Sequence, residues 1–405
     1  MTNPMKVLIF NRSFYPDFES TGQLLTELCE DLVLEGYDVT VICGRPYFVS
    51  SKPSKLFNNE CYKGIKIIRA FGTTLLKENL IYRILNLLSY FISSFIAGHF
   101  VKEKPDIVIT QSDPPVSGFL GLYFSRLYKS KFVYYPQDFF YEMALVNKKI
   151  KNSFLLWILK SSENLFLKKS DKIICIGNSV KKTILSEGVS DLKINVIHNW
   201  VDTSLLYPIK KDQNSFIVNN NLTGKFIVMY SGNLGYKEDL EIILDTARCF
   251  TKSENVKFVI LGGGARKNEL INKVNSENIS NILFLPYQEK KDLKYSLSAA
   301  DLHIIATKKE LSSIIVPSKI YGIMASGRPF LSWMKKDSEI GEIVTNYKCG
   351  INLDPVSLEL IIEKIKWCQK NPDVLDAMGN NGRVAAEECF DRKIATRKIS
   401  ESLNS

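Results

Sequence analysis

Apolar runs of strand length alternate with helical patterns along most of this 405-residue chain, and this alternation limits its fold more than any other feature. Two such runs, at 7–10 and 39–43, flank residues 24–34, where leucines recur at helical spacing. Four further runs follow, at 105–110, 132–136, 172–176 and 194–199. Strands that alternate with helices in this way predict a parallel sheet covered by helices on both faces.

An asparagine-rich polar stretch, residues 210–224, interrupts the alternation and is the best candidate for a linker. Strand-like runs then begin again at Phe226, Val256, Asn281, Asp301 and Arg328. We therefore expect an α/β protein with two Rossmann-like, doubly wound domains, residues 1–209 and 225–385. Open parallel sheets bind ligands beyond the carboxyl ends of their strands, so the cleft between the two halves is the expected site.

The composition narrows the choice of partners. The formal net charge is +10, the eight cysteines form no CxxC pair, and there are only three histidines, of which His303 lies in an apolar run and is expected in the core. Excess positive charge favours phosphorylated substrates, anionic lipid or nucleic acid, although lysines also serve solubility alone. No nucleic-acid-binding motif or metal-ligand spacing accompanies the charge. We therefore expect no nucleic acid partner, no metal and no cofactor, in a reducing compartment.

The stretch VPSKIYGIMASGRPF, residues 316–330, predicts a helix start that binds an anion. Pro317 suits the first helical position and Gly327 suits the residue after the helix end, so we predict a helix over 317–326. The first-turn N–H groups of Ser318 and Lys319, together with the lysine ammonium, would then face a phosphate.

Glycines at three predicted strand ends could also admit a diphosphate. Gly232 stands in YSGNLG, Gly263 in LGGG, and Gly22 in FESTGQ. Each glycine would let a backbone approach a phosphate closely, or each could simply form a tight turn. No GxGxxG follows the first strand and no GxxxxGK[ST] is present, which disfavours a dinucleotide oxidoreductase and an ATPase.

Taken in order, HNWVD, YSGNLG, FLPYQ, AADL, VPSKIYGIMASGRP and DSEIGEIV resemble the motifs of family 4 glycosyltransferases of the GT-B fold, over nearly the whole chain. Within that family they resemble the branch that builds bacterial O-antigen, capsule and exopolysaccharide. The resemblance implies retention at the anomeric carbon, a nucleotide-diphosphate sugar on the C-terminal half, an acceptor on the N-terminal half, and a last helix, 386–405, that crosses back to the N-terminal domain. The donor-binding residues that it implies are Gly22, Gly232, Asn233, Lys237, Gly263, Pro286, Tyr287, Ile315, Val316, Pro317, Ser318 and Lys319.

The chain departs from the family pattern at three motif positions, and its match at a fourth has two interpretations. Many members carry two carboxylates eight residues apart, one of which meets the donor ribose, and here those positions hold Ile314 and Gly322. The commoner pattern also has an arginine after the first glycine and a lysine a few places on. Asn233 takes the arginine position, and Lys237 is either the second cation or a solvated loop lysine.

Acceptor-side residues come from the same resemblance. In VYYPQDFFYE, Gln137 and Asp138 match the place where the family has a residue facing the reacting sugar, often His then Asp. Asp138 is the candidate catalytic residue, because a carboxylate there could orient the acceptor hydroxyl or accept its proton. The alternative is that Asp138 caps the following helix. Asn199 is the further acceptor-side candidate.

Two segments, 75–104 and 146–169, pair apolar helical faces with basic ends. Such helices suit an anionic membrane surface. The alternative is that both helices only cover the N-terminal sheet. Residues 84–98 are too few to span a bilayer, and the N-terminus has no signal-peptide pattern. We therefore expect a cytoplasmic protein, peripheral on the inner membrane.

The resemblance implies a hexosyl- or N-acetylhexosaminyltransferase that uses a nucleotide-diphosphate sugar, with a UDP-sugar favoured. The acceptor would be a lipid-linked glycan, with a polyprenyl carrier, or another glycan. Because the two carboxylates are missing, a second hypothesis stays open: a non-catalytic relative that binds nucleotide or glycan within a polysaccharide assembly complex.

Overall fold

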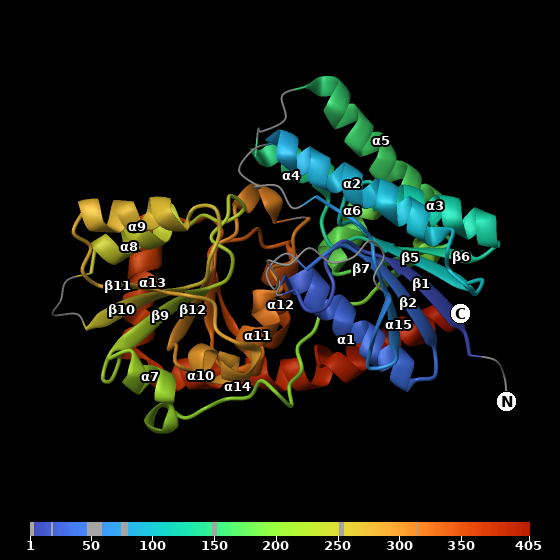
Figure 1. Ribbon diagram of the computed structural model, residues 1–405. Coiled ribbons are helices and arrows are strands. Elements are labelled where there is room, and N and C mark those ends of the chain that lie inside the picture. Colours follow the sequence, from blue (N-terminus) through green and yellow to red (C-terminus); the bar gives the residue numbers. More distant parts are fainter. Residues whose placement is uncertain are drawn as a thin grey trace. The chain divides into compact units, whose positions relative to one another are not determined.

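The computed structural model describes residues 4–17, 19–46, 59–73, 80–147, 152–250, 255–312 and 314–405. The chain forms two compact units, each built on its own sheet (Figure 1). Unit 1 comprises Met1–His198 and Ala395–Ser405, and unit 2 comprises Asn199–Ile394.

Unit 1 is built on an eight-stranded sheet in the order β3-β4-β2-β1-β5-β6-β7-β8. All neighbouring strands run parallel except β3 and β4, which form an antiparallel pair at one edge. The strand order reverses beside β1, where Val7 lies opposite Val39 of β2 on one side and Ile107 of β5 on the other. The strands are β1 Lys6–Phe10, β2 Asp38–Cys43, β3 Asn59–Tyr62, β4 Ile65–Arg69, β5 Ile107–Gln111, β6 Lys131–Tyr135, β7 Lys172–Cys175 and β8 Ile194–Val196.

Helices cover both faces of this sheet, with α1 and α15 on one side and α2, α3 and α5 on the other (Figure 1). Alternate residues of a strand point to opposite faces. On β1, Leu8 and Phe10 accordingly pack with Tyr90 of α2 and Phe124 of α3 in one core cluster. The helices are α1 Ser20–Leu34, α2 Leu80–Gly98, α3 Ser117–Tyr128, α4 Phe140–Asn147, α5 Ser153–Lys169, α6 Asn178–Ser186, α15 Arg392–Asn404 and a 3-10 turn at Asp191–Lys193.

Unit 2 is built on a six-stranded, all-parallel sheet in the order β11-β10-β9-β12-β13-β14. This is the strand order of a doubly wound nucleotide-binding fold, and its reversal falls between β9 and β12. The strands are β9 Phe226–Ser231, β10 Val256–Leu261, β11 Ile282–Leu285, β12 Leu302–Ile305, β13 Phe330–Ser332 and β14 Gly350–Asn352.

The two faces of this second sheet carry separate cores. Val228 and Tyr230 of β9 pack with Leu244 of α8 on one face. Ile227 and Met229 pack on the other, beside α7 and α10. The helices are α7 Ser215–Asn219, α8 Glu241–Arg248, α9 Lys267–Ser276, α10 Leu293–Ser298, α11 Lys319–Ala325, α12 Glu339–Tyr347, α13 Leu358–Lys370 and α14 Pro372–Cys389, with 3-10 turns at Lys211–Gln213, Lys290–Asp292 and Lys309–Leu311.

The predicted linker, residues 210–224, lies inside unit 2, and the division falls between His198 and Asn199. The polar stretch holds helix α7, whose Phe216 and Ile217 are buried in the core of that unit. Asn214 caps this helix by accepting a hydrogen bond from the N–H of Phe216 at 3.0 Å. The asparagines that suggested a linker therefore include a helix cap.

The helix predicted over 317–326 begins two residues later, because α11 runs from Lys319 to Ala325 with Ser318 as its cap. The Pro317 carbonyl accepts from the N–H of Ile320 at 3.1 Å, so the proline lies in a tight turn before the helix. Within the described part of the chain, no helix is both long and apolar enough to cross a membrane.

Candidate functional site

The carboxyl edge of the unit 2 sheet brings together the glycine turns that follow β9 and β10. The N–H of Gly232 donates to the Leu261 carbonyl and the N–H of Gly262 donates to the Leu285 carbonyl, both at 2.9 Å. Gly232 and Gly262 each have a φ of 149°, a conformation that favours glycine. A Cβ on Gly262 would lie 1.9 Å from the Gly232 carbonyl oxygen, so only glycine permits these turns to touch.

Lys319 reaches this glycine turn from the start of α11. Its ammonium donates to the Tyr230 hydroxyl at 2.9 Å and lies 4.0 Å from the centre of the Tyr230 ring. It also lies 3.6 Å from the Glu238 carboxylate. A Cβ on Gly232 would be 3.0 Å from Lys319 Nζ, so the glycine leaves room for the charge. Lys319 and Gly232, two of the predicted donor residues, are thus in direct proximity.

The electrostatic setting of Lys319 is a buried cation opposed by one carboxylate. Its side chain is 15% exposed, and burial lowers its pKa, while the charge of Glu238 acts in the opposite direction. Burial, helped by Glu238, raises the pKa of Tyr230 well above its usual value, so Tyr230 remains a neutral hydroxyl. Thr307, beyond β12, donates to Glu238 at 3.4 Å. Sequence reasoning missed Tyr230 and Glu238, although Glu238 stands directly after Lys237.

Residues after β11 complete this edge. The Tyr287 hydroxyl donates to the Gly263 carbonyl at 3.2 Å, and a Cβ on Gly263 would lie 3.2 Å from the tyrosine ring. Tyr287 is 60% exposed, and Pro286 beside it is also exposed. The structure therefore places the predicted residues Gly263, Pro286 and Tyr287 together, with an open aromatic face.

The two positions where the family pattern has carboxylates, 314 and 322, have apolar surroundings in this structure. Ile314 is buried, as are Ile315 and Val316 after it. A Cβ on Gly322 would lie 3.4 Å from Leu297 Cδ1. Neither position supplies a polar group to a ribose, so any sugar contact of that kind must come from elsewhere.

Asn233 and Lys237 lie in the loop after β9, as predicted, but with different exposure. The Asn233 side chain is exposed, and its carbonyl accepts from the Tyr230 hydroxyl at 2.8 Å. Lys237 is half-buried, and its carbonyl accepts from the N–H of Lys308 at 3.0 Å. The Lys319 side chain is held against the Gly232 turn.

In unit 1, Gln137 and Asp138 lie just beyond the carboxyl end of β6. The backbone N–H groups of both donate to Ser112 Oγ at 3.1 Å, and the buried Ser112 follows β5. The alternative interpretation made Asp138 a cap for the next helix. The Glu163 carboxylate accepts from the first N–H groups of α4, at Phe140 and Tyr141, and a cap by Asp138 stays an alternative.

The same edge of unit 1 contains an ion pair across its strand-order reversal. Arg12, after β1, lies 2.9 Å from Asp113, after β5, and the charge of Asp113 is the main cause of a raised Arg12 pKa. The predicted donor residue Gly22 packs α1 against the turn after β1, because a Cβ there would lie 2.5 Å from Ser13 Oγ. Asn199 is buried at the start of unit 2.

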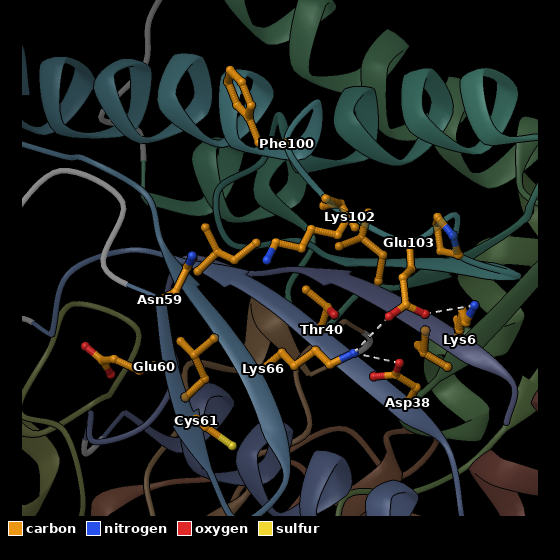
Figure 2. Close-up of a pocket in the computed structure, with 16 residues that line it drawn as sticks. Lys6, Asp38, Thr40, Asn59, Glu60, Cys61, Lys66, Phe100, Lys102 and Glu103 are labelled. Carbon is orange, nitrogen blue, oxygen red and sulfur yellow. Dashed lines mark hydrogen bonds and ion pairs between the residues drawn. The ribbon is translucent and has the colours of Figure 1, made fainter.

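A hollow of about 470 Å³ lies at the opposite, amino-terminal edge of the unit 1 sheet (Figure 2). Figure 2 shows Lys66 between Asp38 and Glu103, at 2.7 and 3.7 Å, while Lys6 lies 2.9 Å from Glu103. These lysines and carboxylates pair with one another, and the hollow holds none of the predicted site residues.

The two parallel-sheet units define the class of protein, because they have the fold of GT-B glycosyltransferases. Residues 21–205 match Glycosyltransferase Family 4, and residues 211–385 match Glycosyl transferases group 1. The chain belongs to the family 4 glycosyltransferases, and its two parallel-sheet units have the GT-B fold, as the sequence predicted.

Three particular proteins illustrate the similarity. WcaI of Escherichia coli (strain K12), a candidate glycosyl transferase of colanic acid biosynthesis, is 24% identical over 98% of both chains. Sucrose-phosphate synthase of Thermosynechococcus elongatus has a TM-score of 0.80 at 15% identity, over 99% of this chain and 98% of that one. Anabaena HepE, solved with UDP-glucose, has a TM-score of 0.73 at 16% identity, over 99% of both chains.

His303 is a core residue, as predicted, and we predict that it makes unit 2 sensitive to acid. It is fully buried on β12, its Nε2 donates to the Leu297 carbonyl at 2.9 Å, and burial lowers its pKa to about 4. Because the fold favours the neutral ring, stability should fall as the pH drops from about 6.5 toward 4, by about 3 kcal/mol.

Denaturant unfolding of His303→Gln should lack this pH-dependent step, because the amide can donate to the same carbonyl without titrating. His99→Gln, at an exposed histidine, is the matched control and should keep the step. The same loss of stability in His303→Gln as in the unmodified protein would contradict the assignment.

Proposed function

We propose that this glycosyltransferase moves a sugar from a UDP-sugar, with retention, to a lipid-linked or other glycan in bacterial surface-polysaccharide synthesis. The observation that carries the proposal is the Lys319 ammonium held beside the Gly232 turn at the carboxyl edge of unit 2. The role named for WcaI supports the process, and the UDP-glucose bound by HepE supports the donor. Hexosyl and N-acetylhexosaminyl donors both fit this proposal.

In the proposed complex, the donor diphosphate lies against the Gly232 turn. Glycine lets the backbone approach the phosphates. Lys319 supplies a positive charge, and its attraction to the leaving diphosphate grows as negative charge develops there. Glu238, 3.6 Å away, favours the protonated form of this buried lysine in the empty site.

The uracil ring is proposed to lie on the open face of Tyr287. A planar base stacks well on an exposed aromatic ring, and Tyr287 is fixed by its bond to the Gly263 carbonyl. The neighbouring backbone around Pro286 would then form hydrogen bonds with the edge of the base.

Asp138 is proposed to act on the acceptor. Retention requires the acceptor oxygen to bond to the anomeric carbon on the face from which the diphosphate leaves. The bond from that carbon to the phosphate oxygen breaks, and the acceptor proton passes to the leaving phosphate or to Asp138. Asp138 is half-buried, and its loop is anchored by Ser112 at 3.1 Å, which favours a fixed orientation of the hydroxyl.

The second hypothesis, a non-catalytic nucleotide- or glycan-binding relative, is favoured by one observation. Ile314 and Gly322 leave the two family carboxylate positions without a polar group. A charge-assisted hydrogen bond contributes about 1.5–3 kcal/mol, so its loss weakens donor binding about tenfold to a hundredfold. Release of UDP that depends on both donor and acceptor would support the enzyme and reject the non-catalytic relative.

We predict that Lys319→Ala weakens UDP binding by a factor of about ten or more, because it removes the cation from the diphosphate. Calorimetric titration of UDP, GDP, dTDP and CMP, with and without magnesium, measures this loss and should give the lowest Kd for UDP. Lys257→Ala is the matched control, since Lys257 lies near the amino end of β10, and it should bind like the unmodified protein. Equal binding by Lys319→Ala would reject the phosphate clamp.

We predict that Asp138→Asn abolishes sugar transfer but leaves the UDP Kd within about twofold, because the substitution removes a proton acceptor without changing unit 2. UDP release at saturating donor measures turnover, and calorimetry measures binding. Asp191→Asn, at an exposed aspartate of unit 1, is the control. Normal turnover by Asp138→Asn would remove Asp138 from the reaction.

We also propose that unit 1 lies on the cytoplasmic face of the inner membrane. Helices α2, α3 and α5 lie on one side of its sheet (Figure 1). They carry exposed apolar side chains, which we call the apolar patch. Exposed basic residues stand near the helix ends, at Arg126, Lys168 and Lys169. The apolar patch comprises Ile84, Leu85, Leu88, Ile92, Ile96, Phe119, Tyr123, Leu127, Phe154, Leu155, Trp157 and Ile158. Such a surface suits anionic lipid and a lipid-linked acceptor.

We predict that the protein floats with anionic liposomes at low salt and that the double change Phe154→Ser and Trp157→Ser reduces the bound fraction at least tenfold. These two side chains are 66% and 63% exposed, so removing them costs membrane contact without opening the core. Trp367→Ser, in unit 2, is the control. Protein that stays at the bottom of the gradient would reject the membrane proposal.

A further inference from the structure

Glu163 is a buried carboxylate that holds the start of α4. It lies on α5 and is 5% exposed. Its Oε1 accepts hydrogen bonds from the backbone N–H groups of Phe140 at 2.7 Å and Tyr141 at 3.3 Å. The first N–H groups of a helix have no partner within it, so this side chain from another helix satisfies them.

The loop that carries Asp138 lies between two anchors. At one end, Ser112 Oγ accepts from the N–H groups of Gln137 and Asp138, and at the other end Glu163 accepts from Phe140 and Tyr141. We propose that Glu163 is a positioning residue, whose carboxylate fixes the start of α4 and thereby the orientation of Asp138. This inference rests on the proposed catalytic role of Asp138.

Several charged and titratable groups face Glu163 from the elements around it. Glu142 lies on α4, Tyr134 on β6, and Lys160 one turn away on α5. Lys160 bonds Glu142 at 3.2 Å and also pairs with Glu187, after α6. Among the described residues, the second oxygen of Glu163 has no hydrogen-bond partner. Within the described part of the chain, the carboxylate therefore directs its hydrogen bonds to the α4 backbone.

Burial, followed by the repulsion from Glu142, raises the pKa of Glu163 to about 7. Folding therefore favours the protonated acid, and the stability it contributes is lost as the pH rises from about 4.5 through 7. The ionised form nevertheless makes the stronger bonds to the α4 N–H groups, because charge-assisted hydrogen bonds are about twice as strong as neutral ones. Near neutral pH, ionisation of Glu163 therefore lowers the free energy of unfolding but strengthens the hydrogen bonds that hold the start of α4.

Hydrogen exchange of the full-length protein without ligand tests the anchor directly. After correction for intrinsic rates, amides of residues 137–141 should be about threefold to tenfold better protected at pH 8 than at pH 6. Glu163→Gln offers a neutral acceptor at every pH and should match the acid form at both. Glu163→Met offers none and should lose at least tenfold in protection. Glu187→Gln, which contacts Lys160 and not α4, is the matched control.

Turnover provides the second readout. Glu163→Met should lower kcat at least tenfold with an unchanged UDP Kd, and Glu163→Gln should restore most of it with a flatter pH profile. Unchanged loop protection in Glu163→Met, or a pH profile of Glu163→Gln identical to the unmodified protein, would overturn the inference. If Glu163→Met does not fold, the comparison of Glu163→Gln across pH decides alone. Failure of the unmodified protein to transfer sugar would reject the proposed function, while the exchange result would still decide the anchor.

Discussion

The reversal of strand order in each sheet is the constraint on which the rest of the molecule depends. In unit 2, β9 lies between β10 and β12. The chain passes from β9 to β10 on one side and from β12 to β13 on the other, so the loops after β9 and β12 diverge at the carboxyl edge. An isolated bridge between Glu238 and Thr307 joins these two loops. Unit 1 repeats the arrangement at β1 and β5, where Arg12 and Asp113 form the cross-link. The donor-side candidates of unit 2 and the acceptor-side candidates of unit 1 each lie near the reversal of strand order in their sheet.

The charges at the unit 2 edge explain how a buried lysine is accommodated beside the Gly232 turn. A buried ammonium without a partner would be strongly destabilised, and Lys319 avoids this by facing Glu238 and the Tyr230 hydroxyl. A diphosphate brings two or more negative charges close to the ammonium. On the proposed function, the donor therefore takes over the role of Glu238 as counter-ion, and the lysine needs no rearrangement to meet it.

The sequence predicted the strands with continuous apolar runs and the glycine turns that follow them, because burial on both faces leaves a clear pattern. It missed β3, a polar edge strand of sequence NECY, the strand β4, whose apolar run in IKIIR is broken by a lysine, and the three-residue β14. It predicted a linker at 210–224, where the structure has helix α7, because asparagine serves both loops and helix caps. Glu238 and Glu163 escaped notice for a different reason: each acts through a contact far away in sequence, which spacing does not reveal.

Helix α5 connects the two proposals made for unit 1. Its exposed side carries Phe154 and Trp157 of the apolar patch, while its buried side carries Glu163, which holds the loop of Asp138. A helix that rests on a membrane and also anchors the acceptor-side loop would fix that loop with respect to the lipid surface. For a sugar acceptor attached to a lipid, this arrangement limits the positions from which the hydroxyl can approach Asp138. The apolar patch would then serve orientation as well as affinity, because both depend on the same rigid element.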